Sequence, residues 1–282
     1  MIIQVDGLTK FYGSKAGVKD LNFKVKEGEV FGFLGPNGAG KTTTIRLLLG
    51  FIRPTEGQAT VLNRHVWRDS VAIRNLVGFI PGEIHVYENM TCEHLLLFMG
   101  RFRRTFNPRL MYSLADRLEF DLKLKVKGLS KGMKQKVGVI QGFMHDAPLL
   151  ILDEPSSGLD PLMQLEFIEL LREQKAQGKT IFLSSHVLTE VERVCDAVGI
   201  VRDGALVAVE EIEALKAKRL RRMDVTFARP VDPTVFNLPG VCVLSANGAH
   251  VQLGVRSDLA TLLKFLGDHE AVDMTFAPPD LE

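Results

Sequence analysis

Cysteine is scarce in this chain of 282 residues, and long apolar runs are missing altogether. The three cysteines, Cys92, Cys195 and Cys242, lie far apart and form no CxxC pair. That spacing argues against a cysteine metal knuckle or a dithiol redox motif and fits a reducing compartment. No apolar run approaches the roughly 20 residues that a membrane-spanning helix needs. If the protein works at a membrane, we expect another chain to do the spanning.

An excess of charge of either sign is missing as well. Lysine and arginine number 35, aspartate and glutamate 34, and the net charge is +1. This balance gives no electrostatic reason to expect nucleic acid or an acidic partner. A hydrophobic share of 46% and a charged share of 24% are typical of a soluble globular protein. The length predicts two domains, and an acid and a glycine within the first ten residues argue against a signal peptide.

The stretch GPNGAGKT, residues 35–42, fits the phosphate-loop pattern G-x-x-x-x-G-K-[ST]. Its glycines let the backbone curl with N–H groups turned inward, which forms a nest for an anion. Lys41 would reach the β- and γ-phosphates of a nucleotide, and the Thr42 hydroxyl would bind Mg²⁺. Apolar residues over 30–34 predict a strand before the loop, and helical spacing over 45–50 predicts a helix after it. The helix N-terminus would then point at phosphate.

Two adjacent carboxylates, Asp153 and Glu154, follow an apolar strand predicted over 149–152. The carboxyl ends of parallel strands are where α/β sheets place their chemistry. Asp153 would hold Mg²⁺ directly or through water, and Glu154 would polarise a water near the γ-phosphate. A second apolar strand, over 180–183, ends shortly before His186. Of the seven histidines, His186 alone follows a strand end in this way.

Three other features each allow two interpretations. Tyr12, upstream of the phosphate loop, could stack on a nucleotide base or pack in a sheet core. Ser130 is a candidate N-cap for a helix over 131–144, whose N-terminus is either simply capped or an anion site. The basic stretch 210–222 is either a solvated helix face followed by a linker or a contact for anionic lipid or a partner.

The remaining sequence organises these motifs into domains. Residues from about 88 to 146 are helical in character, and Asn107-Pro108 is an N-cap and first-turn pair. We expect a helical subdomain there, inserted into an α/β core. A small second domain is expected over 223–282, with a hairpin across Asn247-Gly248, a helix over 259–266 and no catalytic constellation.

Taken in order, the motifs resemble those of an ATP-binding cassette (ABC) ATPase, specifically the nucleotide-binding subunit of an ABC transporter. The matching pieces are GPNGAGKT at 35–42, LSKGM at 129–133, LLILDEP at 149–155, SGLD at 157–160 and His186. The resemblance implies an α/β P-loop NTPase cassette over residues 1–218, with a RecA-like core, an N-terminal antiparallel β subdomain and the inserted helical subdomain.

The tail is similar to the C-terminal α+β accessory domain of ATPases paired with ABC-2-type permeases, which are often exporters. In such relatives the tail usually continues beyond the leucine-glutamate pair that ends this sequence. We therefore expect this chain to be a shortened form.

The resemblance also implies ATP and Mg²⁺ as cofactors and assigns a role to each matched residue. Tyr12 would stack on adenine, Glu154 would be the general base, and His186 would contact the γ-phosphate. In a head-to-tail dimer, Ser130 and Gly132 would reach the γ-phosphate held by the other protomer, and Asp160 would lie at the interface. Glu154, His186 and Lys41 would be catalytic, and Thr42 and Asp153 would bind the metal. The phosphate-loop contacts would be Gly35, Pro36, Asn37, Gly38, Ala39, Gly40, Lys41, Thr42 and Thr43.

The chain departs from the family pattern at two places. In the signature LSGGQ, Lys131 replaces the first glycine and Met133 replaces the glutamine. After the strand expected to end at residue 80, the family carries a glutamine or glutamate, where this chain has Gly82. Glu83 stands next to it and is an alternative source of the missing side chain.

The expected function is ATP hydrolysis that drives a separate transmembrane permease, from the cytoplasmic face of the cell membrane. The ATP-binding subunits would pair as a homodimer or heterodimer, the tail favours an exporter, and no nucleic-acid partner is expected. The alternative is a soluble ABC ATPase acting on ribosomes or nucleic acid. Such proteins generally carry two cassettes or long coiled coils, whereas this chain has one phosphate loop and no sustained heptads. A GTPase switch would need an N-K-x-D motif, which the sequence lacks.

Overall fold

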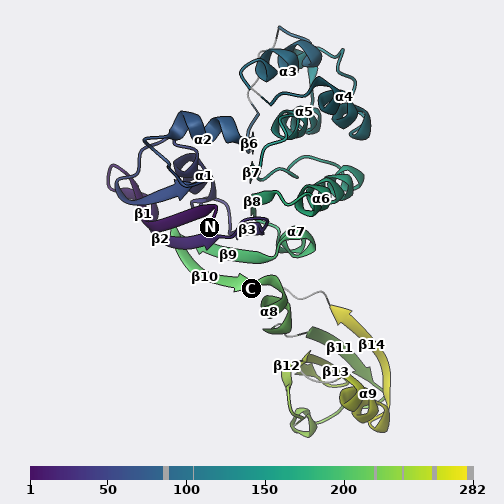
Figure 1. Cartoon of the computed structure of the whole chain (residues 1–282). Helices are drawn as coiled ribbons and strands as arrows, with labels where there is room; N and C mark the ends of the chain where they lie inside the picture. The colour runs from purple at the N-terminus through teal and green to yellow at the C-terminus, as the bar shows by residue number, and fades with distance from the viewer. Residues whose placement is uncertain (85–88, 104, 219–220, 237, 256–258, 278–282) are drawn as a thin grey trace. The chain divides into compact units, whose positions relative to one another are not determined.

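The computed structural model describes residues 1–84, 89–103, 105–218, 221–236, 238–255 and 259–277 (Figure 1). It divides into two compact units, Met1–Ile212 and Glu213–Glu282. Residues 219–220 of the basic stretch and the final residues, 278–282, which include the leucine-glutamate pair, lie outside the described residues.

A six-stranded sheet forms the centre of the first unit, in the order β10-β9-β3-β8-β7-β6. Neighbouring strands pair in parallel except for β10, which runs antiparallel to β9. Both β3 and β7 are buried along their whole length, as their continuous apolar runs predict. The strands are β3 (Val30–Leu34), β6 (Val77–Ile80), β7 (Leu149–Asp153), β8 (Thr180–Ser185), β9 (Ala197–Arg202) and β10 (Ala205–Glu211).

A second, antiparallel sheet packs against this centre. Its order is β2-β1-β4-β5, formed by β1 (Ile3–Tyr12), β2 (Lys15–Val25), β4 (Glu56–Val61) and β5 (Arg64–His65). Phe23 of β2 stacks on Phe31 of β3 and on Phe182 of β8, with ring centroids 5.7 and 6.0 Å apart. This shared aromatic core fixes the first hairpin, including Tyr12, beside the loop that follows β3.

The helices of the first unit follow the expected starts closely. Asn107 caps α4 by accepting the Leu110 N–H at 3.3 Å, and Ser130 caps α5 by accepting the Met133 N–H at 3.3 Å. Helices α3, α4 and α5 lie together in Figure 1. The helices are α1 (Lys41–Leu48), α2 (Ser70–Leu76), α3 (Cys92–Gly100), α4 (Pro108–Arg117), the 3₁₀ turn Val126–Gly128, α5 (Lys131–Phe143), α6 (Pro161–Ala176) and α7 (Leu188–Val194).

The second unit contains one antiparallel sheet in the order β12-β13-β11-β14. The predicted hairpin across Asn247-Gly248 is confirmed, since β12 pairs with β13 there. Leu262 and Leu266 of α9 are buried against one face of the sheet with Met223, Val225 and Leu253. The elements are β11 (Arg221–Phe227), the 3₁₀ turn Pro233–Val235, β12 (Val241–Asn247), β13 (His250–Val255), α9 (Leu259–Asp268) and β14 (Ala271–Ala277).

The prediction of a helix and then a linker over 210–222 is wrong at both ends of the stretch. β10 continues to Glu211, the helix α8 (Ile212–Lys218) is short, and β11 already begins at Arg221. The reason is tertiary: Arg221 and Arg222 join the ladder with β13, which outweighs the local helical preference of the basic residues.

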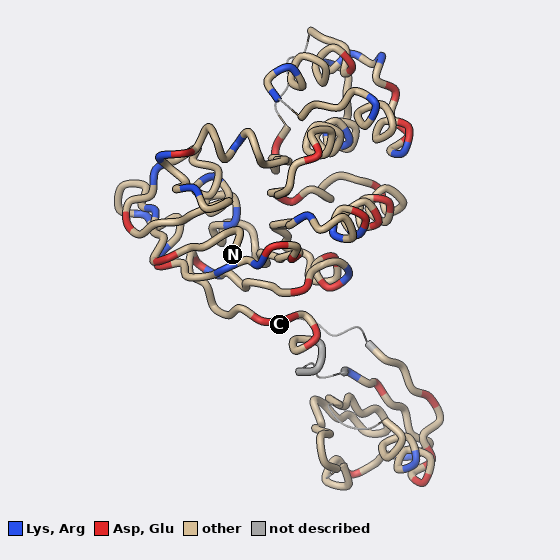
Figure 2. The backbone as a smooth tube through the Cα atoms, in the orientation of Figure 1, with Lys and Arg blue, Asp and Glu red and all other residues tan. Residues whose placement is uncertain are grey.

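Charges of both signs are interspersed along each unit (Figure 2), in keeping with the balanced composition. Within the part of the chain that the structure describes, no helix is both long and apolar enough to cross a membrane.

Candidate nucleotide-binding and catalytic site

The phosphate loop joins β3 to α1 and depends on its glycines. Gly38 and Gly40 have φ angles of +81° and +104°, which side chains with a Cβ rarely adopt. A Cβ at Gly40 would also lie 2.7 Å from the Gly17 carbonyl oxygen. No side chain of the described residues caps α1. The N–H groups of its first turn are therefore available to an anion, as in other phosphate loops.

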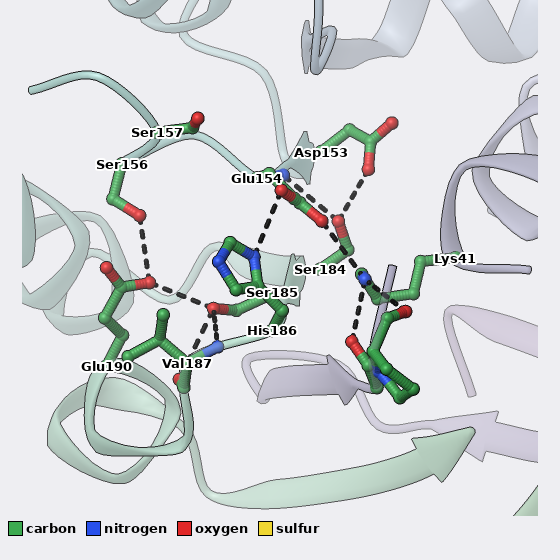
Figure 3. Close-up of polar contacts among 12 residues, drawn as sticks. Lys41, Asp153, Glu154, Ser156, Ser157, Ser184, Ser185, His186, Val187 and Glu190 are labelled. Atoms are coloured by element: carbon green, nitrogen blue, oxygen red, sulfur yellow. Dashed lines mark hydrogen bonds and ion pairs between the residues drawn. The ribbon is translucent and has the colours of Figure 1, made fainter. Parts of the chain in front are cut away.

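Lys41, the first residue of α1, is buried with only 4% of its side chain exposed. Its ammonium donates to the carbonyl oxygens of Gly35 at 2.8 Å and Pro36 at 3.1 Å. It also pairs with Glu154 Oε1 at 3.1 Å (Figure 3). Lysine and carboxylate come from distant parts of the sequence, and the parallel sheet brings them to one edge. Lys41 is thus held at the mouth of the anion nest.

A cavity of about 360 Å³ opens beside Lys41. Tyr12 lies at this cavity and is 48% exposed, so it is not an aromatic of the sheet core, and its ring stays available for the other interpretation, stacking on a nucleotide base. The ring covers Gly17, where a Cβ would be 2.8 Å from a ring carbon. The lining residues are Tyr12, Lys15, Ala16, Gly17, Asn37, Gly38, Gly40, Lys41, Thr42, Thr43 and Glu154. Ala39 of the same loop does not line the cavity. It is buried, and its carbonyl oxygen accepts a hydrogen bond from the Gly204 N–H.

The second carboxylate, Asp153, lies at the end of β7 and is only 2% exposed. Ser184 Oγ of the neighbouring strand β8 donates to Asp153 Oδ1 at 2.6 Å. Gly82 packs on the other side of the same carboxylate, since a Cβ there would lie 3.3 Å from Asp153 Oδ2. Asp153 therefore has a fixed orientation, with a glycine at the position where the resemblance implies a longer side chain.

Thr42 and Asp153 line a second cavity, of about 590 Å³, together with Gly82, Glu83 and Glu154. A hydroxyl and a carboxylate are the hard oxygen donors that Mg²⁺ prefers, so these residues fit that ion. No group of three or more His, Cys, Asp or Glu able to hold a metal occurs among the described residues. A metal at this site would therefore need phosphate oxygens or water to complete its coordination.

Glu154 contacts two other residues of the site, Lys41 and His186. Its carboxylate bridges Lys41 through Oε1 and His186 through Oε2, which is 3.2 Å from His186 Nδ1 (Figure 3). Its backbone is left-handed, with φ of +45°, and its N–H donates to the oxygens Oγ and O of Ser184, at 3.1 and 3.2 Å. A strained backbone at a catalytic position persists only when neighbours hold it there, and Ser184 supplies those contacts.

Two polar residues that position this region were missed by the sequence reasoning. Ser184 links Asp153 and Glu154, as described above. Gln135 of α5 is 3% exposed and donates through Nε2 to the Pro155 carbonyl oxygen at 2.7 Å. Its signal was present in the sequence, because a glutamine occupies the buried stripe of α5 that Val139 and Gly142 continue.

Ser130, Gly132 and Asp160 lie elsewhere in the chain's own fold, and none of these described residues lines either cavity above. Ser130 caps α5, and Asp160 caps α6 through the N–H groups of Leu162 and Met163 at 3.1 and 3.0 Å. Gly132 packs on the backbone of Gly158. The N-terminus of α5 is therefore capped by its own Ser130, while Lys131, the first residue of the helix, lines the cavity that holds Thr42 and Asp153.

Comparison with known proteins agrees with this geometry. A family profile described as "ABC transporter" matches residues 18–157. The bacitracin transport ATP-binding protein BcrA of Bacillus licheniformis is 38% identical over 79% of this chain and 74% of its own length. The Nod factor export ATP-binding protein I of Bradyrhizobium diazoefficiens is 39% identical, over 76% of this chain and 72% of its own.

Solved structures similar to this chain are also ATP-binding cassettes. The ATP-binding subunit of an ABC transporter superposes with a TM-score of 0.71 at 31% identity, covering 77% of this chain and 92% of that one. A dimeric ATP-binding cassette described in a post-hydrolysis state with ADP and Pi has a TM-score of 0.68, with 74% of this chain and 98% of that one covered; at 21% identity it supports the fold alone. With the phosphate loop, the paired carboxylates and their cavities in place, the chain belongs to the family of ABC transporter ATP-binding subunits, has the P-loop ABC ATPase fold, binds ATP and is an ATPase.

Proposed function

We propose that this chain hydrolyses Mg-ATP in a head-to-tail dimer of ATP-binding subunits and thereby drives a separate permease. The observation that carries the proposal is the position of Glu154 between the buried Lys41 ammonium and His186, beside the phosphate-loop cavity. Because Glu154 lines the phosphate-loop cavity, its carboxylate would be available to a water beside a bound γ-phosphate. It would accept that water's proton as general base, a role worth about 10²–10⁴-fold in rate.

The other residues have distinct parts in this mechanism. When ATP binds, the Lys41 ammonium would leave the Gly35 and Pro36 carbonyls and contact the phosphates, which also releases Glu154 from its ion pair. The N–H groups of Gly38, Gly40 and the first turn of α1 would hold the phosphate oxygens. His186 would fix the γ-phosphate, and Tyr12 would stack on adenine. Gly35, Pro36, Asn37, Ala39 and Thr43 would complete the loop that holds the nucleotide.

Thr42 and Asp153 are the residues that would hold Mg²⁺. The ion neutralises charge that develops on the phosphate oxygens during transfer. Ser184 keeps Asp153 oriented for this role through its 2.6 Å hydrogen bond. Because Gly82 has no side chain, we propose that Glu83, which lines the same cavity as Thr42 and Asp153, supplies the carboxylate on that side.

Dimerisation would complete the site. Ser130 and Gly132 lie at the N-terminus of α5 and, among the described residues, line neither cavity beside the chain's own phosphate loop, so we propose that they contact the γ-phosphate held by the partner subunit. Asp160 would lie at that interface. The helix N-terminus favours the negative charge developing there.

The relatives suggest the wider setting. Their names describe bacitracin transport and Nod factor export, and we propose that this chain likewise serves an exporter, of the ABC-2-type suggested by its tail. It would act as a peripheral subunit at the cytoplasmic face of the cell membrane, attached through its permease.

The decisive test replaces Glu154 by glutamine, which keeps the shape and removes the base. We expect ATP turnover to fall by roughly 10²–10⁴-fold, while ATP binding persists, measured by phosphate release and equilibrium binding. Glu169→Gln, on the exposed surface of α6, is the matched control. Turnover by Glu154→Gln at the wild-type rate would contradict the assignment of the base.

A second experiment tests the partner. Tagged Glu154→Gln protein is recovered from solubilised membranes in the presence of ATP, and the proteins that copurify are identified. A polytopic permease supports the transporter assignment. Recovery of ribosomes or nucleic acid without a membrane protein would favour the soluble class of ABC ATPase instead.

A further inference from the structure

The two loops that carry the catalytic groups are joined by a third carboxylate, Glu190, that the mechanism above does not use. Glu154 is followed by Pro155 and Ser156, while His186 is preceded by Ser185. Ser156 Oγ donates to Glu190 Oε2 at 2.9 Å, and Ser185 Oγ donates to the same oxygen at 3.0 Å (Figure 3). One atom of α7 therefore accepts hydrogen bonds from both loops.

The geometry around Ser185 extends this link to the histidine. Ser185 is 3% exposed, and its Oγ accepts the N–H of Val187 at 2.9 Å. The same hydroxyl thus closes a tight turn around His186 on one side and donates to Glu190 on the other. If the carboxylate were removed, the Ser185 hydroxyl would keep only its longer contact to the Val187 carbonyl oxygen, at 3.3 Å. The turn that presents the imidazole would then lose its tie to α7.

The contacts around Ser156 likewise anchor the segment that carries Glu154, the proposed base. The two residues before Ser156 are held from different directions, since Gln135 of α5 donates to the Pro155 carbonyl oxygen at 2.7 Å and the Glu154 N–H donates to Ser184 Oγ at 3.1 Å. Glu190 supplies the third anchor of this segment, through Ser156. A loop that carries a left-handed glutamate needs such anchors, because its backbone conformation is intrinsically unfavourable.

We infer that Glu190 is a positioning residue for ATP hydrolysis: it fixes the separation of Glu154 and His186 by accepting one hydroxyl from each of their loops. The inference rests on the proposed roles of those two residues. Glu190 lines the cavity of about 220 Å³ between the two loops, together with Glu154 and His186. It is absent from the lining of the phosphate-loop cavity, among the described residues, so its loss should affect the chemical step rather than nucleotide binding.

The test compares Glu190→Ala with Glu190→Gln in the full-length protein. Alanine removes the shared acceptor, and we expect kcat to fall by roughly 10–100-fold, because small misplacements of catalytic groups are costly. The KM for ATP should stay within about twofold, since the phosphate loop is untouched. Glutamine keeps an acceptor oxygen, so we expect it to restore kcat to within about threefold of the wild type. Glu169→Ala, on exposed α6, controls for the loss of a surface carboxylate.

Serine variants keep the inference testable if Glu190→Ala folds poorly. Ser156→Ala and Ser185→Ala each remove one hydroxyl and leave the carboxylate in place. Each should lower kcat, and in the Glu190→Ala background neither should lower it further, because contacts of one network are not additive. Thermal melting and ATP binding are measured for every variant, so that a loss of folded protein is separated from a loss of turnover.

The outcomes are distinct. Wild-type kcat in Glu190→Ala, or in both serine variants, overturns the inference. Loss of activity in Glu190→Gln equal to that in Glu190→Ala overturns it too, because the negative charge, rather than the acceptor, would then be required. Either result leaves the proposed function intact as long as Glu154→Gln is inactive, whereas an active Glu154→Gln would overturn the proposed base itself.

Discussion

The central sheet of the first unit and the small sheet of the second unit, β12-β13-β11-β14, use similar residue types to different ends. In the central sheet, β3, β7 and β8 run parallel, so Gly35, Asp153 and Ser185 stand at one edge, beside Lys41 and His186. In the small sheet all pairs are antiparallel, and polar side chains pair across strands instead. Asp224 accepts from Gln252 at 2.9 Å, and Thr226 lies 3.0 Å from the His250 ring.

This difference explains where chemistry concentrates. Parallel strands end together, so polar groups from distant parts of the sequence converge at one edge, where a single ligand can reach them. Antiparallel strands satisfy their polar groups within the ladder, which stabilises the sheet and leaves no convergent site. We therefore expect changes in the first unit to alter catalysis, and equivalent changes in the second to alter stability alone.

Matched glycine substitutions test this contrast most strongly. Gly40→Ala places a Cβ 2.7 Å from the Gly17 carbonyl, at a φ of +104°, and so distorts the phosphate nest. Losing two hydrogen bonds to charged phosphate, at about 1.5 kcal/mol each or more, should weaken ATP binding by more than about 100-fold. Gly248→Ala, at a φ of +63° with open space around it, should cost the small sheet only about 1–2 kcal/mol and leave ATP binding unchanged. Equilibrium binding measures the ATP affinity of both variants. An equal loss of affinity in the two would contradict the proposed difference between the units.

Truncating a core side chain of the small sheet gives a second test of the contrast between the two units. Leu253 on β13 is fully buried between the sheet and α9. Leu253→Ala should lower the free energy of unfolding of the second unit by about 2–5 kcal/mol, through lost burial and the cavity left behind. Leu244→Ala, at an exposed position on β12, is the control. Denaturant unfolding followed with ATP turnover would show whether the first unit is insensitive, and a matching loss of turnover would contradict the separation of roles.

The sequence predicted the local parts of the site well and the links between them poorly. The phosphate loop, the cap at Ser130 and the carboxylates at the end of β7 are each specified by contiguous residues, whose pattern alone indicates a loop, a cap or a strand end. The Lys41–Glu154 ion pair joins residues that only the order of parallel strands brings together. The order of the strands does not follow from the pattern of any one of them.

Glu190 was missed for a related reason. Its partners, Ser156 and Ser185, are common residue types at unremarkable spacing, and a glutamate in the first turn of a short helix reads as a surface residue. Only the convergence of two hydroxyls on one oxygen distinguishes it. The prediction of a helix and linker around Arg221 was wrong for a different reason. The backbone there pairs with β13, and this pairing outweighs the helical preference of the local sequence.

A buried histidine of the first unit gives the smallest and most specific effect. His145, after α5, is 5% exposed, and its Nδ1 has no hydrogen-bond partner among the described residues. Burial, assisted by the nearby Arg103 charge, lowers the pKa of His145 to about 4. The unfolded chain, with a histidine pKa of about 6.5, binds the extra proton between these values. Stability from His145 is therefore complete above about pH 6.5 and is lost as the pH falls toward 4.

By pH 5 this linkage should cost the folded first unit about 2 kcal/mol, and His145→Gln should remove that dependence. The measurement is denaturant unfolding of wild type and variant at pH 7 and pH 5, with the difference between them as the readout. His250→Gln, whose ring is exposed on the small sheet, is the matched control and tests whether burial is the cause. If wild type and His145→Gln lose stability in parallel between the two pH values, the buried ring does not control the acid sensitivity of the first unit, and the exposed carboxylates common to both units must account for it.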